Sequence, residues 1–171
     1  CDLWREGQHF GWDAIRPYDY TTPVGGYYDD GSRAQADMEI KWMAEHGISV
    51  YMPCWFRSST RTKTTLYGDK WDAFLSSPYI DKIKFAIIYE ASGGVSSADD
   101  FMNNILPYWT ERYFKHPSYY TVDNKPVIAI WGAEKLKNGV GGAENNAAMF
   151  EKIEQMLIKE GFSGAIFITN T

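Results

Sequence analysis

The chain has 171 residues, of which 44% are hydrophobic, 23% are charged and 16% are aromatic. This composition excludes a disordered chain, and no apolar run approaches the roughly 20 residues that a membrane-spanning helix needs. A formal net charge of -5 without any extended basic patch argues against a nucleic-acid partner. The length suffices for one domain with its own core, so we expect a single domain over residues 1–171.

The first 32 residues are rich in Gly, Tyr and Asp and are predicted to form a long irregular loop. The two cysteines, Cys1 and Cys54, are too few for a disulfide framework and lack metal-ligand spacing. Cys1 could be the acylated first residue of a lipoprotein, but Asp2-Leu3-Trp4 offers no polar tether. The preferred interpretation is that Cys1 continues a strand that starts before the sequence and neighbours Cys54.

From residue 33 onward, helical and strand patterns alternate. Helices are predicted at 33–46, around 71–75, at 97–114 with a kink or division at Pro107, and before Gly161; strands are predicted at 48–55, 82–90, 126–131 and 165–168. This order predicts an α/β protein with a parallel sheet, either doubly wound or the first half of an eight-stranded barrel. No glycine-rich phosphate-binding motif follows an early strand, so no nucleotide cofactor is expected.

Three of the predicted strands end in aromatic or acidic residues. Strand 82–90 ends in Tyr89 and Glu90, and its two neighbours end in Trp55 and Trp131. Ligands gather at the carboxyl ends of parallel strands. Because the apolar faces of sugar rings stack on aromatic rings, this pattern predicts a sugar site, with Trp12 as a further platform. The alternatives are core packing for the rings and an ion pair for Glu90.

Other polar residues carry weaker signals. Glu134 follows the strand ending in Trp131 as a general acid would, although Gly132-Ala133 predicts a loop there. Asp29 and Asp30 could hold hydroxyls or calcium, but a Tyr-Tyr-Asp-Asp-Gly sequence is more typical of a turn. The basic residues of 57–63 are predicted to lie in a solvated loop. His9 and His46 lack partners at ligand spacing, and no metal site is expected.

Four segments carry a longer pattern: Pro23–Asp30, Ile40–Ile48, the Tyr89-Glu90 strand end, and Tyr113–Tyr119 with Asn124–Val127. Together they resemble the glycoside hydrolase family 99-like barrels and the related WbsX-like proteins of polysaccharide gene clusters. The resemblance implies a (β/α)8 TIM barrel, of which residues 1–171 supply roughly the first half, and a glycan substrate such as an α-mannoside. The predicted substrate-binding residues are Trp12, Tyr28, Asp29, Trp55, Tyr89, Glu90 and Trp131.

In family 99, the carboxylate matching Glu90 helps to bind substrate, but the His, Pro and Tyr that flank it there are missing here. The family's catalytic carboxylates lie on a later strand in a Glu-Trp-His-Glu or Asn-Glu-Trp-x-Glu motif, which does not occur between Cys1 and Thr171. The catalytic pair is therefore predicted to lie C-terminal to this segment. Within residues 1–171, Glu90 and Glu134 are the candidate catalytic residues.

The leading hypothesis is a glycoside hydrolase of which these residues form the N-terminal part. Two alternatives stay open: a complete chain that has lost hydrolysis and only binds glycan, and a WbsX-like protein of polysaccharide biosynthesis. The expected partner is an oligosaccharide or polysaccharide. By the resemblance alone, the expected location is extracytoplasmic: periplasmic, at the cell surface or secreted.

Overall fold

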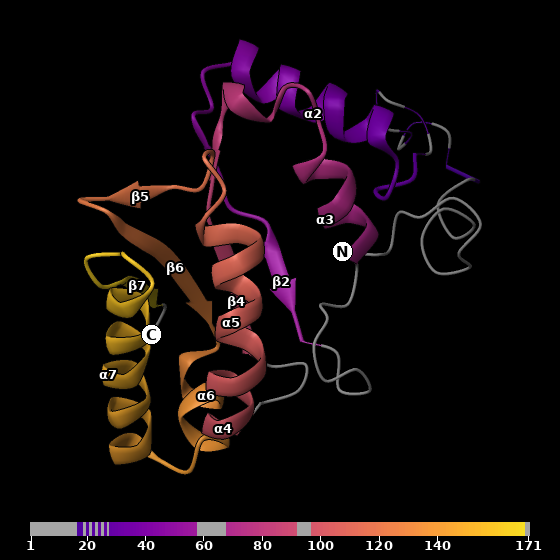
Figure 1. Cartoon of the computed structure of the whole chain (residues 1–171). Helices are drawn as coiled ribbons and strands as arrows, with labels where there is room; N and C mark the ends of the chain where they lie inside the picture. The colour runs from indigo at the N-terminus through magenta and orange to yellow at the C-terminus, as the bar shows by residue number, and fades with distance from the viewer. Residues whose placement is uncertain are drawn as a thin grey trace. The chain divides into compact units, whose positions relative to one another are not determined.

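The computed structural model describes residues 17–57 apart from 19, 21, 23, 25 and 27, together with 68–91 and 97–169. The chain forms two compact units. Unit 1 comprises residues 1–49 and 67–83, and unit 2 comprises residues 50–66 and 84–171. The strand predicted to end near Cys1 lies outside the described residues. Figure 1 shows the elements of both units in chain order.

Unit 1 is helical in its described part. It contains α2 (Arg33–Glu45), α3 (Gly68–Leu75) and a 3-10 turn, η3 (Ile80–Lys82). The Ser32 hydroxyl accepts a hydrogen bond from the Gln35 N–H at 3.1 Å and so caps the start of α2. Gly47, with φ +79°, follows the end of α2 in a conformation that favours glycine. The helix predicted at 33–46 is confirmed.

The buried residues of α2 are not those whose spacing predicts the helix. Ala34, Met38, Trp42 and Met43 recur at the helical spacing that predicts this helix, but none of the four is buried, and Trp42 is 42% exposed. The buried residues of α2 are Gln35, Ala36 and Ile40. Since α2 carries apolar residues on two faces, helical spacing predicts the helix but does not select the face that packs.

A parallel sheet forms the centre of unit 2. Its strands are β1 (Val50–Tyr51), β2 (Cys54–Phe56), β3 (Lys84–Phe85), β4 (Ile87–Glu90), β5 (Thr121–Val122), β6 (Lys125–Trp131) and β7 (Ile166–Thr169). The parallel order is β2-β4-β6-β7, with β5 antiparallel on the edge of β6. The short pair β1-β3 precedes β2 and β4 along the chain and is also parallel. The four predicted strands from residue 48 onward are confirmed.

The helical segment after β4 runs without a break from residue 98 to residue 114. It consists of α4 (Ala98–Asp100), η5 (Phe101–Ile105), α5 (Leu106–Trp109) and η6 (Thr110–Phe114), of which η5 and η6 are π-helical. Pro107 lies in the first turn of α5, between these two π-helical segments. Since proline has no N–H to donate, the wider π turns accommodate the loss without ending the helix.

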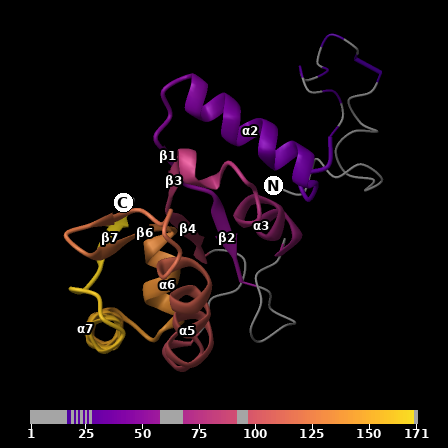
Figure 2. The ribbon, with the colours of Figure 1, turned by 45° about the horizontal axis from the view of Figure 1, so that its top comes forward.

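Two more helices follow β6. They are α6 (Ala133–Gly139) and α7 (Ala143–Lys159). The loop predicted after Gly132 is therefore wrong, because Gly132, with φ +80°, serves as the residue before the helix rather than as part of a longer loop. The sequence spacing predicts one apolar face of this helix from Met149, Ile153, Met156 and Leu157; of these, Met149, Ile153 and Leu157 are buried and Met156 is partly exposed. Figures 1 and 2 both show α5, α6 and α7 gathered beside β4 and β6.

The register of the sheet separates its two faces. Tyr89 pairs with Ile130 across β4 and β6, and both are buried. On β7, Phe167 packs on Phe150 of α7 with ring centroids 4.5 Å apart. Because successive strand residues point to opposite faces, these side chains define the face that the helices cover. The alternate residues, including Glu90 and Trp131, lie on the other face.

A buried tyrosine ties β4 to β6 near their amino ends. The Tyr119 hydroxyl donates to the Val127 carbonyl at 2.8 Å and accepts from the Ile87 N–H at 3.3 Å. Burial raises the pKa of the Tyr119 phenol, so that it keeps its proton. We expect Tyr119→Phe to lower the free energy of unfolding by about 1–3 kcal/mol, because two buried backbone groups lose a partner. Urea denaturation measures this change.

Tyr120→Phe is the matched control, since Tyr120 is only partly buried and its hydroxyl makes no hydrogen bond within the described residues. It should change the free energy of unfolding by less than about 0.5 kcal/mol. Equal stability of the two variants would contradict the bridging role of Tyr119.

Candidate functional site

Three side chains form a row across the carboxyl end of the sheet. Phe56 ends β2, Glu90 ends β4 and Trp131 ends β6. The register pairs Phe56 with Glu90 and Glu90 with Trp131, so all three lie on the sheet face opposite the one that carries Tyr89 and Ile130. Neighbouring strands are about 4.8 Å apart, which places the two aromatic residues roughly 10 Å from each other with the carboxylate between them.

The exposure of these side chains agrees with a binding role. Trp131 is 59% exposed, and Phe56 and Glu90 are partly exposed. Of the predicted site residues, the structure therefore brings Glu90 and Trp131 together on neighbouring strands. Phe56 was missed by the sequence analysis. The signal for it was available, because Phe56 follows Trp55 and must point to the opposite face of its strand.

Trp55 and Tyr89 lie in the core instead. Their exposures are 1% and 0%, and their ring centroids are 5.8 Å apart. Both rings also contact Trp109 of α5, at 5.1 Å and 5.5 Å. A buried ring cannot offer its face to a sugar, so we leave both residues out of the candidate site. The core-packing alternative describes them correctly.

Glu134 lies in the first turn of α6. Its side chain is 77% exposed and is paired with Lys137 of the same helix, with 2.6 Å between Glu134 Oε2 and Lys137 Nζ. A general acid must point its proton at the leaving group, whereas this carboxylate lies in the open and faces a lysine of its own helix. This arrangement favours a surface ion pair over acid catalysis for Glu134.

Arg57 forms a buried ion pair that the sequence analysis missed. It directly follows β2, is 6% exposed, and donates from Nη2 to Asp100 Oδ1 at 2.7 Å and from Nε to Asp100 Oδ2 at 3.2 Å. Asn104 donates to the same carboxylate at 2.7 Å. The predicted solvated position is wrong for Arg57, because its partner is 43 residues away in sequence and no local pattern reveals it.

This ion pair also sets the protonation of Asp100. Burial alone would raise the pKa of the Asp100 carboxyl, but the hydrogen bonds from Arg57 and Asn104 and the charge of Arg57 together lower it. The pair connects the residue next to Phe56 with the first turn of the helix that follows β4. It therefore ties the end of β2, which supplies Phe56, to α4.

The remaining predicted residues belong to unit 1. Asp29 Oδ1 accepts a hydrogen bond from the Gly31 N–H at 2.8 Å, which is the turn that the alternative interpretation expects. Tyr28 is partly buried, and burial together with the Asp30 charge raises the pKa of its phenol. Asp30 is buried and pairs with Lys70 at 2.9 Å. Trp12 lies outside the described residues.

The row of Phe56, Glu90 and Trp131 can bind a ligand that has apolar faces and hydroxyl groups. The Glu90 carboxylate can accept hydrogen bonds, and the Trp131 and Phe56 rings can contact apolar C–H faces. Among the described residues, no three His, Cys, Asp or Glu side chains converge as metal ligands. Within the same residues, no helix has the length and apolar character to span a membrane.

The chain thus has an α/β fold, with a candidate binding site at the carboxyl ends of its parallel strands. The chain is similar to the family 99 endo-α-mannosidase from Bacteroides thetaiotaomicron, with 16% identity and a TM-score of 0.67 over 88% of this chain and 41% of that one. The structure of that enzyme in complex with bis-tris propane has 18% identity and a TM-score of 0.66 over 88% of this chain and 43% of that one. A glycoside hydrolase-like protein has 19% identity to this chain and a TM-score of 0.62 over 86% of this chain and 46% of that one.

These similarities confirm the resemblance to family 99-like barrels at the level of the fold. The chain spans less than half the length of these solved structures, consistent with part of a barrel. No protein-family model and no curated protein matches the chain.

Proposed function

We propose that this protein is carbohydrate-active and binds a glycan at the Phe56–Glu90–Trp131 row. The observation that carries the proposal is the register, which sets one carboxylate between two aromatic residues at the carboxyl end of a parallel sheet. The similar fold of glycoside hydrolases supports it. An α-mannoside is the first substrate to test, since one similar structure is an endo-α-mannosidase.

In the hydrolase form of this proposal, Glu90 binds substrate and the catalytic pair lies C-terminal to Thr171. Glycosidases that use protein carboxylates need two of them, about 5–5.5 Å or 6.5–9.5 Å apart around the bond. The pairing of Glu134 with Lys137 leaves Glu90 as the better placed acid within the described residues. This favours, as a second candidate function, a domain that binds glycan without hydrolysis. An extracytoplasmic location belongs to either form of the proposal.

We expect Glu90→Gln to weaken glycan binding by a factor of about 10–100, because hydrogen bonds to a charged acceptor contribute about 1.5–3 kcal/mol. Isothermal titration calorimetry with α-mannan oligosaccharides measures the affinity. The matched control is Glu134→Gln, which removes an acid that is exposed and outside the row, and it should leave the affinity unchanged.

Unchanged affinity in Glu90→Gln would contradict the site. Turnover of the oligosaccharide, followed by release of reducing ends, separates the two forms of the proposal. Binding with turnover supports the hydrolase, and binding without turnover supports the non-catalytic domain. If the protein bound another glycan but no mannan, the proposed site would stand and the α-mannoside would be wrong.

A further inference from the structure

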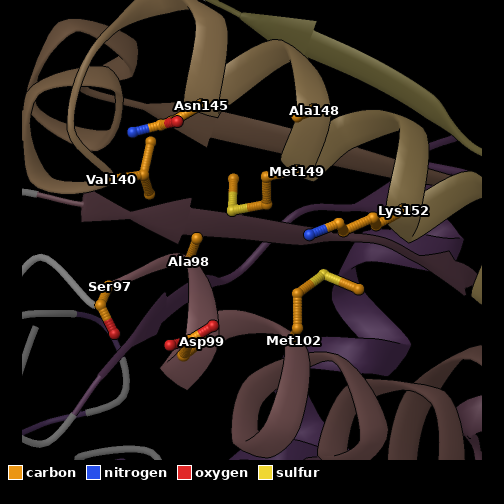
Figure 3. A pocket seen from close by; sticks show the side chains of 9 residues that line it. All are labelled: Ser97, Ala98, Asp99, Met102, Val140, Asn145, Ala148, Met149 and Lys152. Carbon is orange, nitrogen blue, oxygen red and sulfur yellow. The ribbon is translucent and has the colours of Figure 1, made fainter.

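A groove of about 340 Å³ lies between two helices of unit 2, apart from the row that contains Glu90. Figure 3 shows its lining, which comes from α4 and η5 on one side and from the Val140 turn and α7 on the other. Met102, Val140 and Met149 supply the apolar surface, and both Val140 and Met149 are largely buried. Ser97, Asp99, Asn145 and Lys152 supply the polar rim.

The groove is open because small residues stand where the helices face each other. Ala98 on α4 and Ala148 on α7 both line it, and neither side chain is long enough to fill the space between the helices. These helices follow β4 and β6, which are neighbours in the sheet. The groove therefore belongs to the contact between two adjacent helices of one unit.

Two opposite charges on the rim remain available to a ligand. Asp99 on α4 and Lys152 on α7 are both exposed, and within the described residues neither makes a hydrogen bond or an ion pair. On α4, by contrast, the neighbouring Asp100 is paired with Arg57. A ligand that carries a cation and an anion on either side of an apolar group would complement this rim.

The lining favours a protein segment over a sugar. None of the described residues that line the groove is aromatic, so they offer no platform on which a sugar would stack. Met102 and Met149 instead present flexible thioethers, which adapt to aliphatic and aromatic side chains. The volume lies at the lower end of the roughly 300–1,000 Å³ that is usual for binding pockets.

We propose that this groove binds a partner polypeptide that inserts one large apolar side chain between α4 and α7, with a basic residue facing Asp99 and an acidic residue facing Lys152. Because the groove shares no residue with the Glu90 row, this inference stands independently of the proposed function. The partner is defined by its chemistry, an apolar anchor between two opposite charges.

The first test uses a synthetic peptide, acetyl-Arg-Ser-Leu-Ser-Glu-amide, and the protein labelled with ¹³C at its six methionine methyl groups. The methyl signals of Met102 and Met149 should shift in a saturable titration, because these two residues line the groove. A peptide with Ala in place of Leu should cause no shift. Absence of any shift with the leucine peptide at millimolar concentration would overturn the proposal.

Two leucine substitutions on α7 provide a matched pair. Ala148→Leu fills the groove and should abolish the saturable shift, whereas Ala147→Leu adds the same side chain at an exposed position outside the lining and should preserve it. Circular dichroism of both variants shows whether the helix is kept. A shift that survives in a folded Ala148→Leu protein would overturn the proposal.

Charge reversal tests the rim. Lys152→Glu should weaken peptide binding by a factor of about 2–5, the range of an exposed ion pair, and a peptide ending in Lys should restore it. Glu90→Gln should bind the peptide as the parent protein does, so failure here is distinguishable from failure of the glycan site. Equal binding of both peptides by Lys152→Glu would overturn the assigned orientation.

Discussion

Trp55→Ala is expected to lower the free energy of unfolding by about 3–5 kcal/mol, the usual range for removing a large aromatic side chain from a core. The Trp55 ring is 1% exposed and contacts Tyr89, Tyr108 and Trp109, with centroids 5.8, 6.3 and 5.1 Å away. Its removal leaves a cavity between β2 and α5 that rigid aromatic neighbours cannot fill. Chemical denaturation measures the change.

Trp131→Ala is the matched control, because Trp131 ends a neighbouring strand and is 59% exposed. It should change stability by less than about 0.5 kcal/mol, while glycan affinity falls because an aromatic contact is lost. We therefore expect Trp55→Ala to lower stability, and Trp131→Ala to lower glycan affinity with little change in stability. A stable Trp55→Ala protein that no longer binds glycan would contradict our assignment of Trp55 to the core and return it to the site.

The difference between these two tryptophans shows what the sequence can predict. Helices and strands were found from their periodicity and from turn residues such as Gly47, which depend on local sequence. The sheet face to which a strand side chain points follows an equally local rule, since successive residues of a strand point to opposite faces. Tyr89 and Glu90 could therefore never belong to the same face. The sequence prediction that placed both at the site ignored this rule.

Other features depend on contacts that no local pattern contains. The choice between the two faces of α2 is made by packing, and it buries Ile40 while Trp42 stays exposed. The alignment of Phe56 with Glu90 depends on the register between strands 34 residues apart in sequence (90 − 56). A prediction of this register would need the positions of both strands in space.

The second prediction with a large effect on stability concerns the ion pair between Arg57 and Asp100. Arg57→Met should lower the free energy of unfolding by about 2–3 kcal/mol, because it leaves a carboxylate without its charged donor. The effect is below the maximum for a fully buried pair, since Asp100 is 26% exposed. Asp100→Asn keeps the shape of the side chain and removes its charge.

A double-mutant cycle with Arg57→Met and Asp100→Asn isolates the pair. At neutral pH we expect a coupling free energy of at least about 1 kcal/mol, whereas the same cycle on the exposed Lys115–Glu111 pair should give no measurable coupling. Additive effects of the two substitutions would contradict a direct interaction between Arg57 and Asp100.

The pH dependence of this coupling has a definite sign. Asp100 has a lowered pKa in the folded protein, so its contribution to stability is fully present above the unfolded value of about 3.9 and is lost as pH falls through the folded value. Denaturation at a series of pH values should therefore show the coupling vanish in acid. Because Arg57 adjoins Phe56, Arg57→Met should also weaken glycan binding in molecules that remain folded, and unchanged affinity would restrict the pair to a structural role.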